Sequence, residues 1–262
     1  LRNRSDAELV LRAYQLWGRQ CLDHIDGDFA LAVWHVDSQR LFCARDPIGN
    51  KPFHFHWNGT SLFFASDLHA VMAASDVPET PNEGVLAEYL ADQWVSRTET
   101  LWQGINILDA AHCMEVDARG PRIQQYWAPD FFTKLHYAKD SDYIEHYREL
   151  FADTVRRQSR SQSPISIEVS GGLDSSGIFA MAADLERHDQ LASPGFTGYT
   201  LNFAGEPRAD EIDYARAVGK HLNLTIQEIE PAYPEFSSYL RAARTYKDLP
   251  GLPNLVMSAN EL

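Results

Sequence analysis

The chain has 262 residues, 44% of them hydrophobic, which is enough for one or two globular domains. Its net charge of −14 argues against a nucleic-acid-binding surface, and no apolar run approaches the roughly 20 residues that span a bilayer. The three cysteines show no metal-binding or disulfide spacing, and no secretory signal peptide is recognisable. We therefore expect a cytoplasmic protein that acts on small molecules and binds neither nucleic acid nor membrane.

The first half of the sequence is rich in short strand patterns. They predict strands at residues 29–36, 41–45, 52–57 and 61–65. Asn58-Gly59, between the last two, is typical of a two-residue hairpin turn. Helical spacing predicts helices at residues 6–17, 66–74 and 82–91. An antiparallel sheet flanked by helices is therefore the expected structure of this half.

The two halves separate around residues 128–141, where a polar segment with a proline follows a strand-like run. Ser141 is the expected N-cap of the next helix. The apolar face of that helix is expected to hold Ile144, Tyr147, Phe151 and Val155. We place the domains at residues 1–130 and 140–262. Because the chain begins with leucine and stops within an expected helix, we expect it to be a fragment of a longer protein.

The second half alternates strand and helix patterns. Strands are expected at residues 165–169, 196–203 and 224–229, and helices after residue 172 and at 210–222 and 234–246. This alternation predicts an α/β domain with a parallel sheet and right-handed crossovers. Ligands of such sheets bind at the carboxyl ends of the strands.

The loop after the first of these strands carries the clearest chemical signal. Residues 170–176 read Ser-Gly-Gly-Leu-Asp-Ser-Ser and open a helix. The glycines allow the backbone to close around a phosphate, while the amides and the helix N-terminus favour an anion. Asp174 would repel a bare phosphate, so it indicates a metal ion that bridges carboxylate and phosphate. The alternative is a plain Gly-Gly turn with a serine N-cap.

The heptapeptide lacks the Gly-Lys-Ser/Thr of a Walker A loop and resembles the pyrophosphate loop of ATP pyrophosphatases, which cleave ATP to AMP and pyrophosphate. In the first half, Leu-Asp-His-Ile-Asp-Gly-Asp-Phe-Ala at 22–30 and Ala-Arg-Asp-Pro-Ile-Gly-Asn-Lys-Pro at 44–52 resemble the class II glutamine amidotransferase domain of asparagine synthetases. Further resemblance to this family lies at residues 64–67, 104–112, 126–127 and 248–254. Nearly the whole chain is thus similar to the glutamine-hydrolysing asparagine synthetase family.

This resemblance implies an Ntn-type αββα sandwich (α+β) followed by a parallel-sheet ATP-pyrophosphatase domain (α/β), both partial. It implies glutamine-dependent amide formation through adenylation of a carboxylate, with ATP and Mg2+ as cofactors. Glutamine, ATP and aspartate or another carboxylate are the implied substrates, and a homodimer is allowed. Two alternatives remain open: an intramolecular amide synthetase of the same fold, making a β-lactam or macrolactam, and a non-catalytic remnant that binds nucleotide or a partner.

The resemblance also implies site residues. The implied ATP-binding residues are Glu168, Val169, Ser170, Gly171, Gly172, Asp174, Ser175, Ser176 and Leu201, with Asp174 also the metal ligand. The family's nucleophile is an N-terminal cysteine that is absent here, so no catalytic residue is assigned and the chain alone is expected to make no amide. Asp6 matches the carboxylate that pairs with the α-amino group of glutamine. Its alternative role is helix capping, because residues 5–8 form a capping-box pattern.

Several other residues have two possible roles, or depart from the family's pattern. Cys21 and Cys43 are expected to be packing residues, and His54 and His56 solvated strand residues. Arg45 and Asp46 either pair inside a turn or bind a ligand. Asp210 and Glu211 are expected to cap a helix, with contact to the substrate as the alternative. Glu168 stands where the family prefers an apolar residue, and Ala-Ala-His at 110–112 replaces Pro-Gly-His, which indicates a divergent member.

Overall fold

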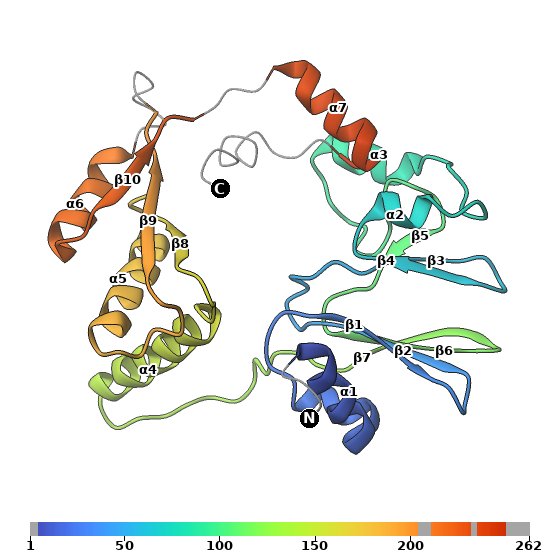
Figure 1. The fold of residues 1–262 in the computed structure, drawn as a ribbon, viewed down its shortest axis with the longest axis horizontal. Coiled ribbons are helices and arrows are strands. Elements are labelled where there is room, and N and C mark those ends of the chain that lie inside the picture. Colours follow the sequence, from blue (N-terminus) through green and yellow to red (C-terminus); the bar gives the residue numbers. More distant parts are fainter. Residues whose placement is uncertain (1–4, 204–210, 232–234, 250–262) are drawn as a thin grey trace. The chain divides into compact units, whose positions relative to one another are not determined.

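The computed structural model describes residues 5–203, 211–231 and 235–249, which form two units (Figure 1). Unit 1 holds the described residues up to Phe132 and those from Leu240 onward, and unit 2 holds those from Thr133 to Tyr239. Each unit has its own sheets and its own buried clusters. No helix in these ranges is both long and apolar enough to cross a membrane.

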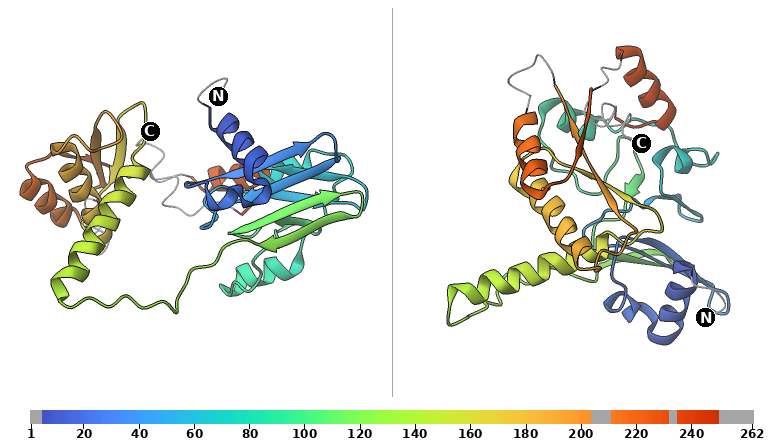
Figure 2. Two further views of the ribbon diagram at one scale, coloured as in Figure 1. Left: turned by 90° about the horizontal axis from the view of Figure 1, so that it is seen from below. Right: turned by 60° about the vertical axis from the view of Figure 1, so that its left-hand side comes forward.

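Unit 1 contains two antiparallel sheets (Figure 2). The first has the order β1 (Ala30–His35), β2 (Arg40–Arg45), β6 (His112–Asp117) and β7 (Gly120–Gln125). The second has the order β4 (Leu62–Ala65), β3 (His54–Trp57) and β5 (Ile105–Ile107). All four predicted strands are present, whereas β5 and β6 were not predicted. The β3–β4 hairpin forms, but its loop has four residues rather than two, because Trp57 pairs with Leu62 and the Asn58 side chain accepts the Thr60 and Ser61 amides.

Helices cover the outer face of each sheet, as Figure 1 shows for α1 and α2. Helix α1 (Asp6–Trp17) and the 3-10 helix η1 (Gly18–Asp23) pack on the first sheet around Cys21, Leu31 and Phe42. Cys43, Phe53, Phe55, Leu108, Met114 and Val116 fill the space between the sheets. Helix α2 (Leu68–Met72) packs on the second sheet near Ile105, and α3 (Glu83–Ala91) follows. The layer order in unit 1 is thus helix, sheet, sheet, helix.

The turn between β2 and β3 is organised by two charged side chains. Asp46 is buried, and its carboxylate accepts four amides, those of Ile48, Gly49, Asn50 and Lys51, at 2.7–3.2 Å. Burial raises the pKa of Asp46, but these four bonds outweigh it and lower that pKa overall. Arg45 donates to the carbonyls of Lys51, Leu108 and Gly49. Both residues therefore shape the turn through the backbone rather than through an ion pair with each other.

The expectation that both strand histidines are solvated is wrong for His56, whereas His54 is half-buried. His56 is buried, and its Nδ1 lies 2.7 Å from the Gly104 carbonyl oxygen. The Nδ1 of His54 lies 2.9 Å from the Ser66 carbonyl oxygen, and burial lowers the pKa of His54. Both rings thus tie β3 to neighbouring loops.

Unit 2 contains a parallel sheet in the order β10 (Ile226–Ile229), β9 (Phe196–Leu201) and β8 (Ile165–Glu168). Helices α5 (Leu173–Arg187) and α6 (Ile212–Leu222) connect these strands and share one buried cluster with them. The predicted parallel sheet is confirmed. A Cβ on Gly198 would lie 2.6 Å from the Phe179 ring, so this glycine lets α5 approach β9.

Helix α4 (Asp140–Gln158) packs against α5, but differently from the prediction. Its N-cap is Lys139, so Ser141 lies inside the first turn. Only Val155 of the predicted face is buried, while Ile144 and Tyr147 are 69% and 70% exposed. Helix α7 (Phe236–Tyr246) is the last of the described elements. The carbonyl of Lys247, which follows α7, accepts a hydrogen bond from the Trp102 indole at 2.6 Å within unit 1. The predicted residues 204–210, 232–234 and 250–262 lie outside the described residues.

Candidate functional site

The loop at residues 170–176 lies at the carboxyl edge of the parallel sheet. Val169 is fully buried, and its amide donates to the Tyr199 carbonyl at 2.7 Å, so β8 stays alongside β9 up to the start of the loop. Glu168 ends β8 with its side chain exposed, and Leu201 ends β9. The structure therefore brings Glu168, Val169 and Leu201, which the resemblance implies bind ATP, to the same sheet edge as the loop at residues 170–176.

Gly171 is required by both its conformation and its packing. Its φ is +83°, which disfavours any residue with a Cβ. A Cβ there would lie 2.4 Å from the Tyr214 Cβ and 2.9 Å from the Ala215 nitrogen. The backbone of the loop therefore rests directly on the first turn of α6.

The N-terminus of α5 has no side-chain cap. Its N-cap is Gly172, with φ = −66° and ψ = 159°, so the serine N-cap expected under the alternative is absent, while a plain Gly-Gly turn stays an alternative. The hydroxyls of Ser170 and Ser175 lie 3.0 Å apart inside the loop. The Ser170 amide donates to the Ser175 hydroxyl at 3.2 Å, and the Gly172 amide to the Ser170 hydroxyl at 3.3 Å. These amides point into the loop, where an anion would compete with the hydroxyls for them.

The two remaining predicted loop residues, Asp174 and Ser176, differ in accessibility. Asp174 is exposed in the first turn of α5, where an acidic side chain interacts favourably with the helix dipole. The Ser176 hydroxyl is buried and has no hydrogen-bond partner among the described residues. Such an unsatisfied group costs about 1–3 kcal/mol, which a ligand oxygen or a water would relieve.

The described part of the chain holds no group of three His, Cys, Asp or Glu residues that could hold a metal ion. Asp174 therefore offers a single carboxylate. Mg2+ on a nucleotide commonly uses one or two carboxylates together with phosphates and waters, so Asp174 fits as one ligand of a nucleotide-bound ion.

Three residues that the sequence pattern did not single out lie close to this edge. Glu228 on β10 accepts two hydrogen bonds from Arg216 on α6, at 2.7 and 2.8 Å. Glu228 also accepts a hydrogen bond from the side-chain amide of Asn202, the residue after Leu201, at 2.9 Å. No local spacing links these residues, because their contact depends on how α6 and β10 are placed in the fold. Glu211 is the N-cap residue of α6, as expected, although its side chain makes no cap hydrogen bond, and Asp210 lies outside the described residues.

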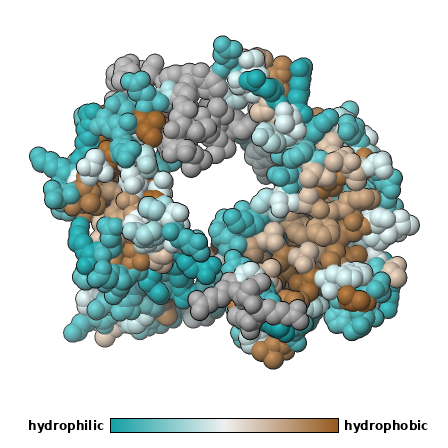
Figure 3. Space-filling model, viewed as in Figure 1, coloured by the Kyte–Doolittle hydropathy of each residue, from teal (hydrophilic) through white to brown (hydrophobic). Residues whose placement is uncertain are grey.

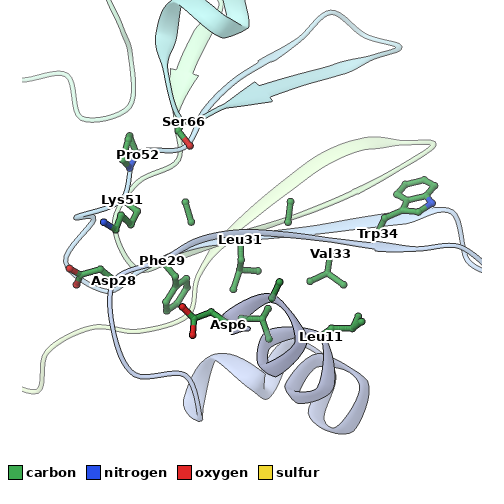
Figure 4. Close-up of a pocket in the computed structure, with 14 residues that line it drawn as sticks. Asp6, Leu11, Asp28, Phe29, Leu31, Val33, Trp34, Lys51, Pro52 and Ser66 are labelled. Atoms are coloured by element: carbon green, nitrogen blue, oxygen red, sulfur yellow. The ribbon is translucent and has the colours of Figure 1, made fainter. Parts of the chain in front are cut away.

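Unit 1 contains a separate cavity of about 760 Å3 beside the edge strand β1 (Figure 4). Asp6, in the first turn of α1, lines it together with Asp28 and Lys51. The remaining lining residues are Ala7, Val10, Leu11, Phe29, Ala30, Leu31, Ala32, Val33, Trp34, Pro52 and Ser66. Some of the apolar ones are also exposed, including Trp34 at 51%, and Figure 3 shows apolar surface over unit 1. The cavity thus combines an apolar wall with charges of both signs.

The helix-capping role expected around Asp6 is also present. Ser5 is the N-cap of α1, and its hydroxyl accepts the Glu8 amide at 3.3 Å. Asp6 thus lies in an acidic first turn and at the same time lines the cavity. The two roles are compatible, and glutamine binding by Asp6 stays a prediction.

Comparison with known proteins defines the class of the chain. Residues 1–127 match the family described as a glutamine amidotransferase domain, and residues 146–256 match the family described as asparagine synthase. The chain therefore joins an amidotransferase domain to an asparagine synthase domain.

Individual relatives agree with this class. Asparagine synthetase [glutamine-hydrolyzing] 3 of Bacillus subtilis is 36% identical, and the alignment covers 96% of this chain and 42% of that protein. Asparagine synthetase [glutamine-hydrolyzing] 2 of the same organism is 30% identical over 76% of this chain and 29% of its own length. Amidase chyE of Penicillium rubens is 26% identical, and the alignment covers 96% of this chain and 38% of that protein. The chain belongs to the glutamine-hydrolysing asparagine synthetase family, and it spans less than half the length of these relatives.

A solved glutamine phosphoribosylpyrophosphate amidotransferase of Bacillus subtilis aligns with 91% of this chain and 44% of its own, at 11% identity and a TM-score of 0.31.

Proposed function

We propose that this chain carries the ATP site and part of the glutamine site of a glutamine-dependent amide synthetase that adenylates aspartate and forms asparagine. In this proposal residues 1–130 form a partial Ntn-type amidotransferase domain, and residues 140–262 a partial ATP-pyrophosphatase domain. The observation that carries the proposal is the Gly171 loop, which rests on α6 at the carboxyl edge of the sheet and precedes a helix without a side-chain cap. A cytoplasmic location and a homodimer stay predictions.

The backbone at Glu168, Val169 and Leu201 would hold the adenine, and residues 170–176 the phosphates. In adenylation, a carboxylate oxygen of the substrate bonds to the α-phosphorus while the bond to pyrophosphate breaks. Negative charge grows on the departing pyrophosphate, and the loop amides and the N-terminus of α5 would stabilise it. Bound Mg2+, held by Asp174, would neutralise part of the same charge. Ammonia then attacks the acyl carbon, the bond to AMP breaks, and the attacking nitrogen loses a proton.

Ammonia for this reaction would come from glutamine at unit 1, with Asp6 pairing with the α-ammonium of the ligand. The described thiols do not suit a nucleophile. Cys21, Cys43 and Cys113 are buried, and burial raises the pKa of Cys21 to about 11 and that of Cys43 to about 12. These cysteines are packing residues, as expected for the first two.

The proposal is tested with a polypeptide of the relatives' length that contains this chain. Glutamate, pyrophosphate, AMP and asparagine are measured with glutamine, aspartate and Mg-ATP present, and again with ammonium in place of glutamine. Equal amounts of pyrophosphate and asparagine from either nitrogen source would support it. Pyrophosphate release with a larger substrate and no use of ammonia would favour the intramolecular synthetase. No pyrophosphate under any of these conditions would leave only the non-catalytic alternative.

A further inference from the structure

Glu228 connects two parts of the sheet edge that are distant in sequence. Its carboxylate accepts two hydrogen bonds from the Arg216 guanidinium, at 2.7 and 2.8 Å. It accepts a third from Asn202 Nδ2 at 2.9 Å. The backbone amide of Asn202 also donates to the Ile229 carbonyl at 2.9 Å, so the backbone after β9 stays against β10. One side chain on β10 is therefore bonded both to α6 and to the residue after β9.

Each of these two partners leads to one half of the proposed nucleotide site. Arg216 follows Ala215, whose nitrogen, together with Tyr214, forms the surface on which Gly171 rests. Asn202 follows Leu201, which ends β9. The path from Glu228 through α6 thus reaches the phosphate loop, and the path through Asn202 reaches the adenine position.

We propose that Glu228 is a positioning residue that fixes the distance between the adenine half and the phosphate half of the nucleotide site. This inference rests on the proposed function. The paired bonds between a guanidinium and a carboxylate hold direction as well as distance, which a single contact does not. With Glu228 in place, α6 and the end of β9 are held in one arrangement, and a ligand that reaches from one to the other binds without first ordering them.

The surroundings of Glu228 indicate that its role is geometric rather than a large contribution to stability. The side chains of Arg216 and Glu228 are 54% and 32% exposed, and solvent screens such a pair. Asp213 is the other acidic group on Arg216, at 3.4 Å and 93% exposed. Asp213 contacts the same arginine but connects nothing to β9, so it provides a matched control.

The test measures the binding of Mg-ATP, AMP and pyrophosphate to the 262-residue chain by calorimetry. Glu228→Gln keeps the size of the side chain and removes its charge and one acceptor. We expect this substitution to lower the affinity for ATP about tenfold, equivalent to about 1.4 kcal/mol. The affinity for AMP or for pyrophosphate should fall about twofold or less, because neither ligand has to reach from the adenine half of the site to the phosphate half. Arg216→Lys, which loses the paired geometry but keeps the charge, should behave in the same direction. Asp213→Asn should leave all three affinities and the thermal midpoint unchanged.

Selective loss of ATP affinity in Glu228→Gln, with the midpoint within a few degrees of the parent, would support the inference. Unchanged ATP affinity would overturn it. Equal weakening of all three ligands together with a fall in the midpoint would also overturn it, because Glu228 would then serve only stability. The unmodified chain could bind pyrophosphate and AMP, and yet bind ATP no more tightly than it binds either of them. In that case the inference fails, while the assignment of the phosphates to the loop stands. If the chain binds none of them, the proposed function fails first.

Discussion

Replacing Gly171 by alanine tests the loop most severely, because two costs add at this position. A residue with a Cβ at φ = +83° pays a conformational penalty of about 1–2 kcal/mol. The new Cβ would lie 2.4 Å from the Tyr214 Cβ, and overpacking of this kind costs roughly 1–3 kcal/mol. We expect Gly171→Ala to destabilise unit 2 by about 2–5 kcal/mol, the sum of these two ranges, and to displace the loop from α6.

Gly172→Ala is the matched control. Its φ of −66° suits any residue, and the nearest atom to the new Cβ is the Ser170 hydroxyl at 3.2 Å, which can rotate away. Loss of the glycine N-cap should cost about 1 kcal/mol or less. The two substitutions add the same methyl group to neighbouring residues, so their difference isolates the contact between the loop and α6.

The assay follows urea unfolding with two probes. All six tryptophans lie at or before residue 127, within unit 1, whereas far-UV circular dichroism reports helices of both units. Gly171→Ala should move the circular dichroism transition to lower urea and leave the tryptophan transition in place. Equal destabilisation by Gly171→Ala and Gly172→Ala would refute the reasoning, because the packing against Tyr214 would then have no energetic effect.

Three further predictions concern unit 1. In a polypeptide of the relatives' length, Asp6→Ala should weaken glutamine binding by roughly 1.5–3 kcal/mol while ammonium-driven synthesis persists; reduced thermal stability with normal glutamine affinity would instead limit Asp6 to its helix. Partial burial lowers the pKa of the half-buried His54, so the unfolded chain takes up a proton at this histidine at higher pH than the folded chain does. Stability should therefore fall as the pH drops below about 6.5, and urea unfolding at pH 7 and pH 5 should show a smaller fall in His54→Gln. Ala111 has φ = +58° in a buried position, so Ala111→Gly should stabilise unit 1 by about 1 kcal/mol, visible as a later tryptophan transition; an earlier one would mean that the lost methyl contact outweighs the relieved strain.

The parts of the fold that depend on local chemistry were predictable from the sequence. The strand, glycine-rich loop and helix at 165–187 follow from short-range signals, and the structure has them in that order. The parallel sheet follows from the alternation of strands and helices. The Ala-Ala-His departure at residues 110–112 also has a local meaning, because Ala111 adopts a positive φ that glycine would take without strain.

Features that depend on distant contacts were not predictable. Ile144 and Val155 share helical spacing, yet only Val155 is buried, since what covers a face depends on how the neighbouring elements pack. His56 alternates with its neighbours on β3 like a solvated residue, but it is buried, and its Nδ1 lies 2.7 Å from the carbonyl oxygen of Gly104, 48 positions later. Arg216 and Glu228 meet only because α6 lies beside β10. A sequence pattern indicates which residues share a face, whereas the tertiary arrangement decides which face is covered.

The central claim is that residues 170–176 bind the phosphates of ATP, and calorimetry of Mg-ATP with the 262-residue chain tests it most directly. We expect one Mg-ATP site per chain, for which pyrophosphate competes. Gly171→Ala and Asp174→Asn should each weaken ATP binding at this site, and Gly172→Ala should retain it. Absence of ATP binding would contradict this claim. So would ATP binding that pyrophosphate does not displace and that is unchanged in both Gly171→Ala and Asp174→Asn.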